Sequence, residues 1–443
     1  MEYPKSIEKV LSRLRENNYQ AFLVGGCVRD HLMGRKISDF DITTDALPKQ
    51  VQKIFASYPQ HAAGLKHGTI TIFDEKEGIE ITTFRRDGEY KDARRPEKVY
   101  FTKELKEDLM RRDFTINALA FSQQEGVIDL FGGRSDIENR IIRAIGDPRE
   151  RFSEDALRIF RAVRFASQLG FSIDPTTYEA MRSMLPLLEK ISAERKAIEL
   201  IKALMGEAIF PVLIKYSEIF AAIAPQIEEM KGFEQKNPHH IYDVLEHTAR
   251  VIQNTPADKE LRLAAFFHDM GKMRTYTEVD GVGHFYGHES VSEEIAASTM
   301  RKLKLDNLTK KNVCLLVRYH DAKIQSKPRS VRRWLNRLGT EHFFKLLVLK
   351  RADAMAQAPA YFSRLDELKE IRAVAEELLA QDACFQLKDL AVDGRDMIEL
   401  GFSGKEIGQA LSFLLEAVLD EKVENNKTEL IQCIGMNFTA IEK

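Results

Sequence analysis

Two carboxylates follow a glycine pair near the start of the chain, within residues 21–44. Asp39 and Asp41 are separated by one residue in an apolar-flanked run. On a strand, residues two apart project to the same face at a Cα separation of roughly 6 to 7 Å, so both carboxylates can bind shared divalent cations. Two-metal phosphoryl or nucleotidyl transfer requires that arrangement. Gly25 and Gly26 lack a Cβ, which lets backbone N–H groups at a helix start approach a triphosphate.

A single Asp-x-Asp is common on solvated strand edges, so the interpretation depends on two further motifs. Arg-Arg-Asp occupies residues 111–113, and Glu-Asp-x-x-Arg occupies residues 154–158. In the second motif Asp155 and Arg158 are three apart, which predicts one helical face. Asp155 offers an acceptor and Arg158 offers donors, so the pair can hydrogen-bond cytosine or adenine, each of which presents an amino donor beside a ring-nitrogen acceptor. The alternative is a salt bridge on a solvated helix.

The elements that would position these residues change character along the chain. The first part alternates strand-like and helix-like patterns, whereas the pattern from Asp136 onward is helical. Residues 68–73 and 79–84 predict an antiparallel hairpin beside the Asp-x-Asp strand, in which Glu80 is either a third carboxylate or a solvent-facing acid. Residues 85–96 predict a mobile loop over the site, and residues 114–121 predict a helix. A helix from Leu157 should end at Gly170.

Composition and charge place limits on the class of protein. The formal charge is −2, but residues 301–350 contain fourteen Lys or Arg against three acidic residues, a candidate surface for a phosphate backbone. No run of about eighteen apolar residues is present and the N-terminus is an amphipathic helix pattern, which predicts a cytoplasmic protein without a membrane partner. The four cysteines form no Cys-x-x-Cys pair, so neither disulfides nor a cysteine zinc site is expected.

Three motifs in this order carry a family resemblance: GGCVRD with DFD, then RRDFTINALA, then EDALRIFRAVRF. Together they resemble the class II tRNA nucleotidyltransferases, which comprise the CCA-adding enzymes and their bacterial poly(A) polymerase relatives. ISAERKAIEL, at residues 191–200, is similar to a later motif of that family. The resemblance implies an α+β fold, with a polymerase-beta-like nucleotidyltransferase head of mixed sheet and helices, followed by an all-α neck, body and tail.

The resemblance also implies roles for individual residues. Asp39 and Asp41 would bind catalytic Mg²⁺ ions. The incoming nucleotide would be bound by a set of further residues: Gly26 and Arg29 in the glycine motif, Arg112 at the phosphates or ribose, Asp155 and Arg158 at the base, and Arg161 and Arg164 along the same row. The partners would be CTP, ATP and the 3′ acceptor end of tRNA. The sequence does not specify an oligomeric state.

Nucleotide specificity within this family depends on the loop between the hairpin and the Arg-Arg-Asp motif. Here RRDGEYKDARRPEKVYF is full length, which favours an enzyme that adds the terminal adenosine as well as the two cytidines. The segment lacks the basic-aromatic signature expected of poly(A) polymerases. An enzyme that adds only A, or only CC, is the alternative within the family.

Histidines are concentrated in the region that begins near Pro238. An imidazole at the end of an apolar helix, followed at once by a carboxylate, is a natural pair of metal ligands, and His268-Asp269 and His320-Asp321 have this pattern. His247 and His288 are further histidines that could complete the set of ligands. The region resembles the HD superfamily of metal-dependent phosphohydrolases. That resemblance implies a site for a second divalent transition metal, with the ligands His247, His268, Asp269 and a later acid, Asp353. The alternative is a helical body that only holds tRNA.

These patterns predict four domains and one main activity. The domains are a nucleotidyltransferase head at 1–140, a helical neck at 141–225, an HD-type body at 226–355 and a helical tail at 356–443. The predicted activity is CCA addition to tRNA from CTP and ATP. The competing hypothesis is an HD phosphohydrolase acting on RNA ends, in which the head has become an RNA-binding module.

Overall fold

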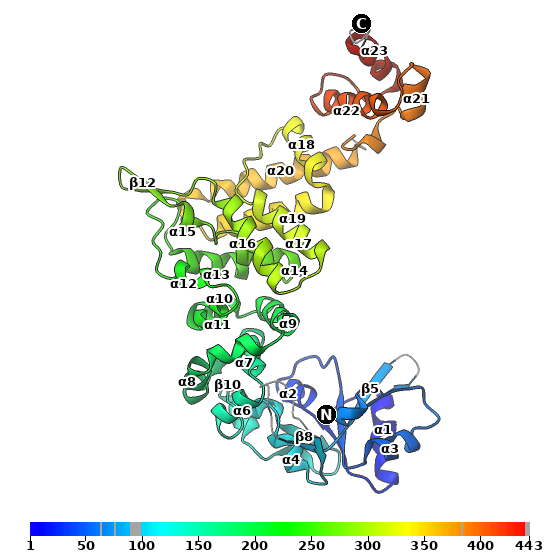
Figure 1. Ribbon diagram of the computed structural model, residues 1–443, viewed down its shortest axis with the longest axis vertical. Coiled ribbons are helices and arrows are strands. Elements are labelled where there is room, and N and C mark those ends of the chain that lie inside the picture. The colour runs from blue at the N-terminus through cyan, green and yellow to red at the C-terminus, as the bar shows by residue number, and fades with distance from the viewer. Residues whose placement is uncertain (63, 75–76, 89–98, 382–383, 439–443) are drawn as a thin grey trace. The chain divides into compact units, whose positions relative to one another are not determined.

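The computed structural model describes residues 1–443 except 63, 75–76, 89–98, 382–383 and 439–443. The described residues form two compact units (Figure 1). Unit 1 contains residues 1–228 and 302–304, and unit 2 contains residues 229–301 and 305–443. Unit 1 combines a large sheet with helices, and unit 2 is helical apart from one small hairpin. The α+β class, with an all-helical later part, is confirmed.

A seven-stranded sheet organises unit 1, with the strand order β3-β4-β5-β2-β1-β8-β9. β2 pairs with β5 in parallel, and the other neighbours are antiparallel. The strands are β1 (Ala21–Val24), β2 (Asp41–Thr44), β3 (Gln60–His61), β4 (Thr69–Asp74), β5 (Glu77–Thr83), β8 (Leu119–Ser122) and β9 (Gly126–Asp129). The predicted hairpin is β4 and β5, and it lies directly beside β2 as expected.

Both faces of the sheet are covered, because successive side chains of a strand point to opposite faces. Leu23 of β1 packs with Leu11 and Leu14 of α1 (Lys5–Glu16), the amphipathic helix expected at the N-terminus. Phe22 and Val24 of the same strand belong to a second core on the other face. The central strand β1 is therefore apolar throughout, and it holds the glycine turn that follows it in a fixed position.

Eleven further α-helices between residues 26 and 230 are described. Among them, α2 follows the glycine turn, and α5 to α9 lie within residues 111–204. They are α2 (Gly26–Leu32), α3 (Pro48–Ile54), α4 (Leu105–Met110), α5 (Gly133–Glu138), α6 (Pro148–Glu154), α7 (Leu157–Leu169), α8 (Pro175–Ser183), α9 (Ala193–Leu204), α10 (Ile209–Lys215), α11 (Ser217–Ala221) and α12 (Gln226–Met230). The helix predicted from Leu157 is α7, and Gly170 ends it in a left-handed conformation, as expected.

One local prediction for unit 1 is wrong, and a second is wrong in its first three residues. Residues 114–121 were predicted as a helix but form a 3-10 turn at Thr115–Asn117 and then β8, because the apolar residues of that segment pair with β1 and β9 in the sheet. The predicted loop begins as a strand, β6 (Arg85–Asp87), which pairs with β7 (Val99–Phe101). The rest of that loop, from 89, lies outside the described residues.

The helices of unit 2 supply the histidine region and the tail. They are α13 (Val244–Asn254), α14 (Lys259–Phe267), α15 (Lys272–Thr275), α16 (His288–Lys302), α17 (Asn307–Tyr319), α18 (Pro328–Leu338), α19 (Thr340–Met355), α20 (Ser363–Ala380), α21 (Gly394–Glu399), α22 (Lys405–Leu419) and α23 (Lys427–Phe438). The prediction that the chain is helical from Asp136 onward holds except for two short strand pairs. Short pairs form at β10 (Ile141–Ile142) with β11 (Ser172–Ile173), and at β12 (Thr277–Val279) with β13 (Val282–His284).

Several cations of the basic segment 301–350 have acidic partners within unit 2. Arg329 and Arg333 both contact the carboxylate of Asp420, at 3.1 and 2.5 Å, and Arg332 contacts Glu421 at 2.6 Å. These pairs join α18 to the end of α22. The excess of positive charge counted along the sequence is therefore partly neutralised by tail residues about ninety positions away.

Within the described part of the chain, every helix is too short or too polar to cross a membrane.

Gly206 sets the close approach of α7 and the segment after α9. A Cβ at Gly206 would lie 2.1 Å from Ser167 Oγ and 2.5 Å from Ser167 C. We expect Gly206→Ala to destabilise the protein by about 1–3 kcal/mol, because Ser167 is fully buried and its backbone cannot shift freely. Chemical denaturation of the full chain measures the change.

The matched control is Gly408→Ala in α22, where an added Cβ meets no atom within 4 Å. A helical glycine in open space should gain about 0.5–1 kcal/mol on replacement by alanine. Equal effects of the two substitutions would contradict this account of the α7 contact.

Candidate active site

The turn after β1 brings the glycine motif against two of the predicted site residues. Gly25 has φ 78° and ψ −129°, a conformation that favours glycine. A Cβ at this position would lie 2.9 Å from Nη1 of Arg112 and 3.9 Å from Oδ2 of Asp41. Gly25 is therefore fixed both by its backbone conformation and by space. Its small size places the Arg112 guanidinium and the Asp41 carboxylate at the same turn.

The two aspartates lie where the interior strand β2 begins, but only one belongs to the strand. β2 begins at Asp41, whereas Asp39 is in the irregular segment before it, so the prediction that both project from one strand is wrong. Strand pairing is lost here because β1 ends at Val24, the partner of Asp41. Both side chains are exposed, and Ser38 donates to the Asp39 carboxylate at 3.0 Å.

Electrostatics nevertheless couple the two carboxylates. Partial burial raises the pKa of Asp41, the nearby Arg112 lowers it, and the charge of Asp39 raises it further. Glu80 of β5 is the register partner of Asp41, and directly opposed residues of neighbouring strands project to the same face. Asp39 and Asp41 are therefore electrostatically coupled, whereas the position of Glu80 rests on its register alone.

Arg112 forms an ion pair with Asp108, a residue that the sequence analysis did not single out. Asp108 is fully buried and contacts Arg111 at 2.9 Å and Arg112 at 3.5 Å. Burial would raise the pKa of Asp108, but the two guanidiniums hold it below its usual value. The Nε of Arg112 has no hydrogen-bond partner among the described residues. The Arg112 atom at the glycine turn is Nη1, which lies where a Cβ of residue 25 would be 2.9 Å away.

A chain of hydrogen bonds connects the glycine motif to α7. Arg29 of α2 donates to Asn117 Oδ1 at 2.7 Å, and Asn117 Nδ2 donates to Asp113 Oδ1 at 3.0 Å. Arg161 of α7 donates to the other oxygen of Asp113 at 2.7 Å. Burial would raise the pKa of Asp113, but Arg161 and Asn117 bring it down to about 2. Asp113 and Asn117 are therefore positioning residues, and their spacing of four in RRDFTIN was the available signal.

The ring of Phe165 makes cation–π contacts with three arginines of this region. Arg29, Arg161 and Arg164 lie over it, with guanidinium carbons 5.3, 5.3 and 4.2 Å from the ring centre. Arg164 also contacts Glu199 at 3.2 Å, and burial lowers its pKa to about 10, so it stays charged near neutral pH. Three predicted binding residues thus share one buried aromatic support.

Asp155 and Arg158 do not share a helical face, contrary to the prediction. α6 ends at Glu154, and Asp155 is in extended conformation before α7 begins at Leu157. At this break Asp155 accepts from the Leu157 N–H at 3.1 Å, at the start of the new helix. Its other oxygen accepts from Arg195 at 2.7 Å.

Arg158 is nearly buried and has its own partners. It donates to Glu154, to the Arg151 carbonyl oxygen at 2.9 Å and to the Arg111 carbonyl oxygen at 2.7 Å. A carboxylate has about four acceptor positions and a guanidinium has five donors. Asp155 and Arg158 therefore both retain hydrogen-bonding capacity. Each is also fixed by contacts with residues outside its own helix turn, which the spacing of the motif does not predict.

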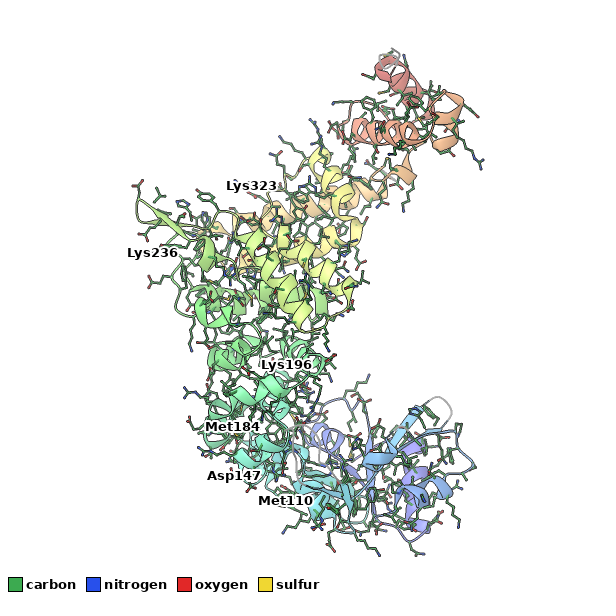
Figure 2. All side chains as sticks on the ribbon, viewed as in Figure 1. Met110, Asp147, Met184, Lys196, Lys236 and Lys323 are labelled. Atoms are coloured by element: carbon green, nitrogen blue, oxygen red, sulfur yellow. The ribbon has the colours of Figure 1, made fainter. Side chains whose placement is uncertain are left out.

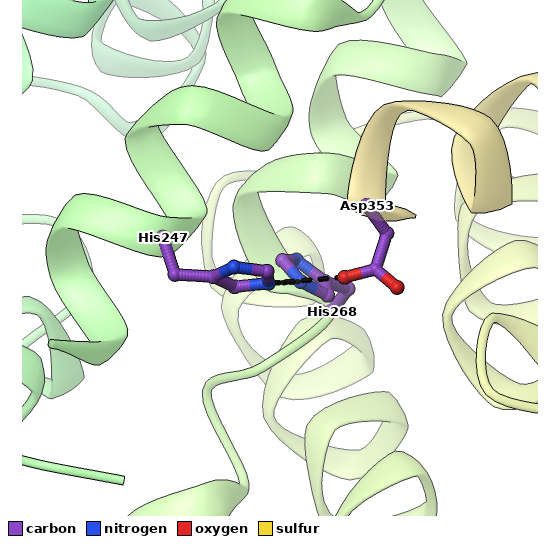
Figure 3. Close-up of side chains that lie close together, drawn as sticks. All are labelled: His247, His268 and Asp353. Atoms are coloured by element: carbon purple, nitrogen blue, oxygen red, sulfur yellow. Dashed lines mark hydrogen bonds and ion pairs between the residues drawn. The ribbon is translucent and has the colours of Figure 1, made fainter. Parts of the chain in front are cut away.

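The predicted histidine ligands come together in unit 2. His247 of α13 and Asp353 of α19 point at each other, with Nε2 and Oδ1 3.0 Å apart, and His268 lies beside them (Figure 3). His268 and Asp269 follow the end of α14, and Asp269 Oδ2 is 3.4 Å from His247 Nε2 and 3.2 Å from His268 Nε2. The structure therefore places all four predicted residues in one buried cluster.

Comparisons with known proteins identify the family. The Poly A polymerase head domain model matches residues 21–143, and the model for tRNA nucleotidyltransferase domain 2 matches residues 284–434. A CCA-adding enzyme of Bacillus pumilus is 36% identical over 428 residues, which cover 94% of this chain and 93% of that protein. The chain belongs to the CCA-adding enzyme family. The predicted resemblance to class II tRNA nucleotidyltransferases is confirmed.

Other CCA-adding enzymes match over different lengths. The enzyme of Limosilactobacillus fermentum is 49% identical over 200 residues, which span 45% of this chain and only half of that protein. The crystal structure of the Bacillus stearothermophilus CCA-adding enzyme in complex with CTP superposes with a TM-score of 0.76 at 30% identity, covering 99% of both chains. The polymerase-type head followed by a helical body is therefore shared with a solved CCA-adding enzyme.

The buried Asp113–Arg161 pair should make folding pH-dependent. We expect Asp113→Asn to lower the free energy of unfolding at pH 7 by about 3 kcal/mol, because Arg161 then lacks its counter-ion. The pKa of Asp113 is lowered to about 2, so its contribution is complete above the unfolded pKa near 3.8 and is lost as the pH falls toward 2. Urea denaturation of both proteins between pH 7 and pH 3 should show the difference shrinking below about pH 4.

The control is Asp366→Asn, which removes an exposed pair with Lys369. That substitution should change stability by less than about 1 kcal/mol at every pH. A pH-independent loss in Asp113→Asn would show that packing, rather than the charge, is responsible.

Proposed function

We propose that this protein adds CCA to the 3′ end of tRNA, using CTP and ATP and no nucleic-acid template. Membership of the CCA-adding enzyme family supports this activity. The observation within the site that carries it is the Gly25 turn, which places the Asp41 carboxylate and the donors of Arg112 together. The names of the relatives do not favour the alternatives that add only A or only CC, nor a hydrolase with a redundant head.

Nucleotidyl transfer in this family depends on divalent metal, and we propose Mg²⁺ held by Asp39 and Asp41. The residues fit that ion, because both carboxylates are accessible and Mg²⁺ prefers carboxylate oxygen and water ligands. Glu80 is a candidate third carboxylate, since it is the register partner of Asp41. When bound, the ions would polarise the α-phosphate and offset its charge.

The remaining residues bind and orient the substrates. The 3′ hydroxyl oxygen of the tRNA bonds to the α-phosphorus, and the bond from phosphorus to pyrophosphate breaks. Arg112 would contact the phosphates or ribose through Nη1 at the Gly25 turn, and Arg29 and Gly26 would bind the nucleotide at the start of α2. Arg161 and Arg164 complete this row from α7.

Base selection would belong to Asp155 and Arg158. Arg195 fixes the carboxylate, while Glu154 and two carbonyl oxygens fix the guanidinium. An acceptor and a donor held at fixed positions suit cytosine and adenine, whereas guanine and uracil would set a carbonyl against the carboxylate. The protein itself would then replace a template strand.

The proposed division of labour follows the predicted domains. Residues 1–140 would act as the catalytic head and 141–225 as the nucleotide-selecting neck, while 226–355 and 356–443 would bind the tRNA as body and tail. A tRNA substrate also supports the expected cytoplasmic location.

Three tRNA substrates test the proposed activity together. They end before CCA, after the first C, and after CC, and each is incubated with CTP, ATP, UTP or GTP in turn. We expect C on the first two, A only on the third, and then no further addition. Addition of A alone, of CC alone, or of a long A tail would each overturn the proposal in favour of the corresponding activity.

Two variants separate catalysis from folding in the same assay. Asp41→Asn should lose more than 10²-fold of incorporation with every substrate, because it removes a metal ligand. Asp45→Asn is the control. Asp45 follows the other end of β2, opposite the start of β1, whereas the glycine turn follows the end of β1. Its carboxylate accepts from the Gln20 N–H at 2.7 Å. Asp45→Asn should retain activity.

Asp155→Ala should change nucleotide choice more than nucleotide affinity. An unpaired polar group costs about 1–3 kcal/mol, so discrimination against UTP should fall by one or two decades. Competition between CTP and UTP on a tRNA lacking CCA measures this ratio.

Arg195→Ala is the matched variant, because it breaks the same ion pair but keeps the carboxylate. Its selectivity should change less than that of Asp155→Ala. Equal selectivity in the wild type and Asp155→Ala would show that Asp155 serves only the ion pair.

A further inference from the structure

Asp108 of α4 is a carboxylate without solvent-exposed surface in unit 1. A buried carboxylate needs matching donors, because an unpaired charge in the interior is strongly disfavoured. Asp108 is contacted by four residues from different parts of the chain: Thr43, Arg85, Arg111 and Arg112. Thr43 belongs to β2, Arg85 begins β6, and the two arginines follow the end of α4. The carboxylate therefore lies where three segments of unit 1 meet.

The two oxygens of Asp108 have different partners. Oδ1 accepts from the Arg85 backbone N–H at 3.3 Å and from Nε of Arg111 at 2.9 Å, and Nη2 of Arg111 is also 2.9 Å away. Oδ2 is 3.5 Å from Nη2 of Arg112 and 3.3 Å from the Thr43 hydroxyl. That hydroxyl is also 3.1 Å from a carbonyl oxygen of β5, so its single proton serves one of two acceptors. Oδ1 thus supports Arg111, and Oδ2 supports Arg112.

Oδ2 determines the direction of the Arg112 guanidinium. A guanidinium is planar and carries its donors in a rigid fork, so fixing one terminal nitrogen limits where the other can lie. Nη2 of Arg112 faces Asp108, while Nη1 lies at the glycine turn, 2.9 Å from where a Cβ of Gly25 would be. The Arg112 side chain is 19% exposed, so without the carboxylate it could rotate and hydrate. Asp108 therefore holds in place the nitrogen that is proposed to contact the nucleotide.

Oδ1 connects the same carboxylate to the residues proposed for the base. Arg111, held by Oδ1, accepts through its carbonyl oxygen from Nη2 of Arg158 at 2.7 Å. The preceding carbonyl oxygen, of Met110, accepts from Arg151 at 3.2 Å. Carbonyls at a helix end have no partner within the helix, so the end of α4, labelled at Met110 in Figure 2, offers acceptors to α6 and α7. Two contacts thus lead from Asp108 through Arg111 to Arg158.

We propose that Asp108 is a positioning residue for the incoming nucleotide. Its Oδ2 holds Arg112 for the phosphates or ribose. Its Oδ1 holds Arg111, which in turn supports Arg158 at the base. This role rests on the functions proposed for Arg112 and Arg158, and Asp108 itself does not touch the nucleotide. One buried carboxylate would then fix the contacts at both ends of the nucleotide relative to the sheet.

The arrangement requires a carboxylate rather than an amide. A carboxylate only accepts, whereas the asparagine side chain has one acceptor oxygen and one donor nitrogen. The shortest contacts of Asp108 are those of Oδ1, so the amide oxygen in Asp108→Asn should take that place. The amide nitrogen would then face Nη2 of Arg112, donor against donor. Asp108→Asn should therefore release Arg112 and keep Arg111 in place.

Nucleotide affinity without tRNA tests the contact with Arg112. The full chain is titrated with CTP, ATP and UTP in the presence of Mg²⁺, and calorimetry gives the Kd of each. Asp108→Asn should raise all three Kd values about tenfold, because a charged donor that is no longer held in place contributes less to binding. The ratio of the Kd of UTP to that of CTP should stay as in the wild type, since Arg158 keeps its support.

The same substitution in an Arg112→Ala background separates positioning from a general structural role. There Asp108→Asn should change the Kd of CTP by less than about twofold, because the side chain through which Asp108 acts is absent. An equal effect of Asp108→Asn in both backgrounds would overturn the proposal, since Asp108 would then act on the fold as a whole.

Asp108→Ala tests the path through Arg111. It removes both oxygens, so the ratio of the Kd of UTP to that of CTP should fall about threefold in addition to the loss of affinity. Wild-type selectivity in this variant would overturn the path to Arg158. Thermal unfolding is measured alongside, and if Asp108→Ala does not fold, the double-variant comparison with Asp108→Asn still decides the role of Asp108.

Glu107→Gln is the matched control. It neutralises the preceding carboxylate of α4, whose side chain is partly exposed. Adjacent residues of a helix do not face the same way, so Glu107 does not share the direction of Asp108. The Kd values of Glu107→Gln should equal those of the wild type.

These measurements are independent of CCA addition, because binding is measured without tRNA. Wild-type Kd values in Asp108→Asn would overturn only the role of Asp108. Failure to extend the three tRNA substrates would instead overturn the proposed activity, while a coupled effect of Asp108 and Arg112 on CTP binding would still support the positioning role.

Discussion

The hydrogen-bonded chain from Arg29 through Asn117 and Asp113 to Arg161 is the constraint on which unit 1 depends. It joins the helix after the glycine turn to α7, so the residues proposed for phosphate and for base are fixed relative to each other. A buried ion pair adds little net stability, since desolvation offsets most of its attraction. Its contribution is geometric: it holds the proposed phosphate contacts and the proposed base contacts at a fixed separation.

Elements whose pattern is local could be predicted from the sequence. The β4–β5 hairpin has period-two apolar residues, and α7 has a helical stripe that ends at a glycine, so both were found near their true positions. The helix predicted at residues 114–121 is wrong because an apolar run of this length suits a helix or a buried strand equally. Only pairing with β1 decides between the two. The prediction that Asp155 and Arg158 share a helical face failed for a related reason. The Asp155 side chain accepts from the Leu157 N–H, a bond that competes with helix continuation and that side-chain spacing does not reveal.

The site was predictable in its residue types but not in its connections. Asp41 and the glycines were singled out by their residue types and Arg112 by the family resemblance, and their roles stay predictions. The comparison with known enzymes confirms the family. The partners that fix them are distant in sequence: Arg161 lies forty-eight residues from Asp113, and Arg195 lies forty residues from Asp155. In the histidine region the ligand types were visible, but bringing them into one cluster required the packing of several helices.

The sharing of Asp420 by Arg329 and Arg333 has a consequence for how the protein would respond to ionic strength. The counterions released on binding are cations condensed on the polyanion. A guanidinium that already has a carboxylate partner neutralises less phosphate charge, so it releases fewer of them. The fourteen cations of residues 301–350 therefore overstate the slope of affinity against salt concentration. Because the fold pairs these arginines with an acid of the tail, the segment offers less free positive charge to a polyanion than its composition indicates.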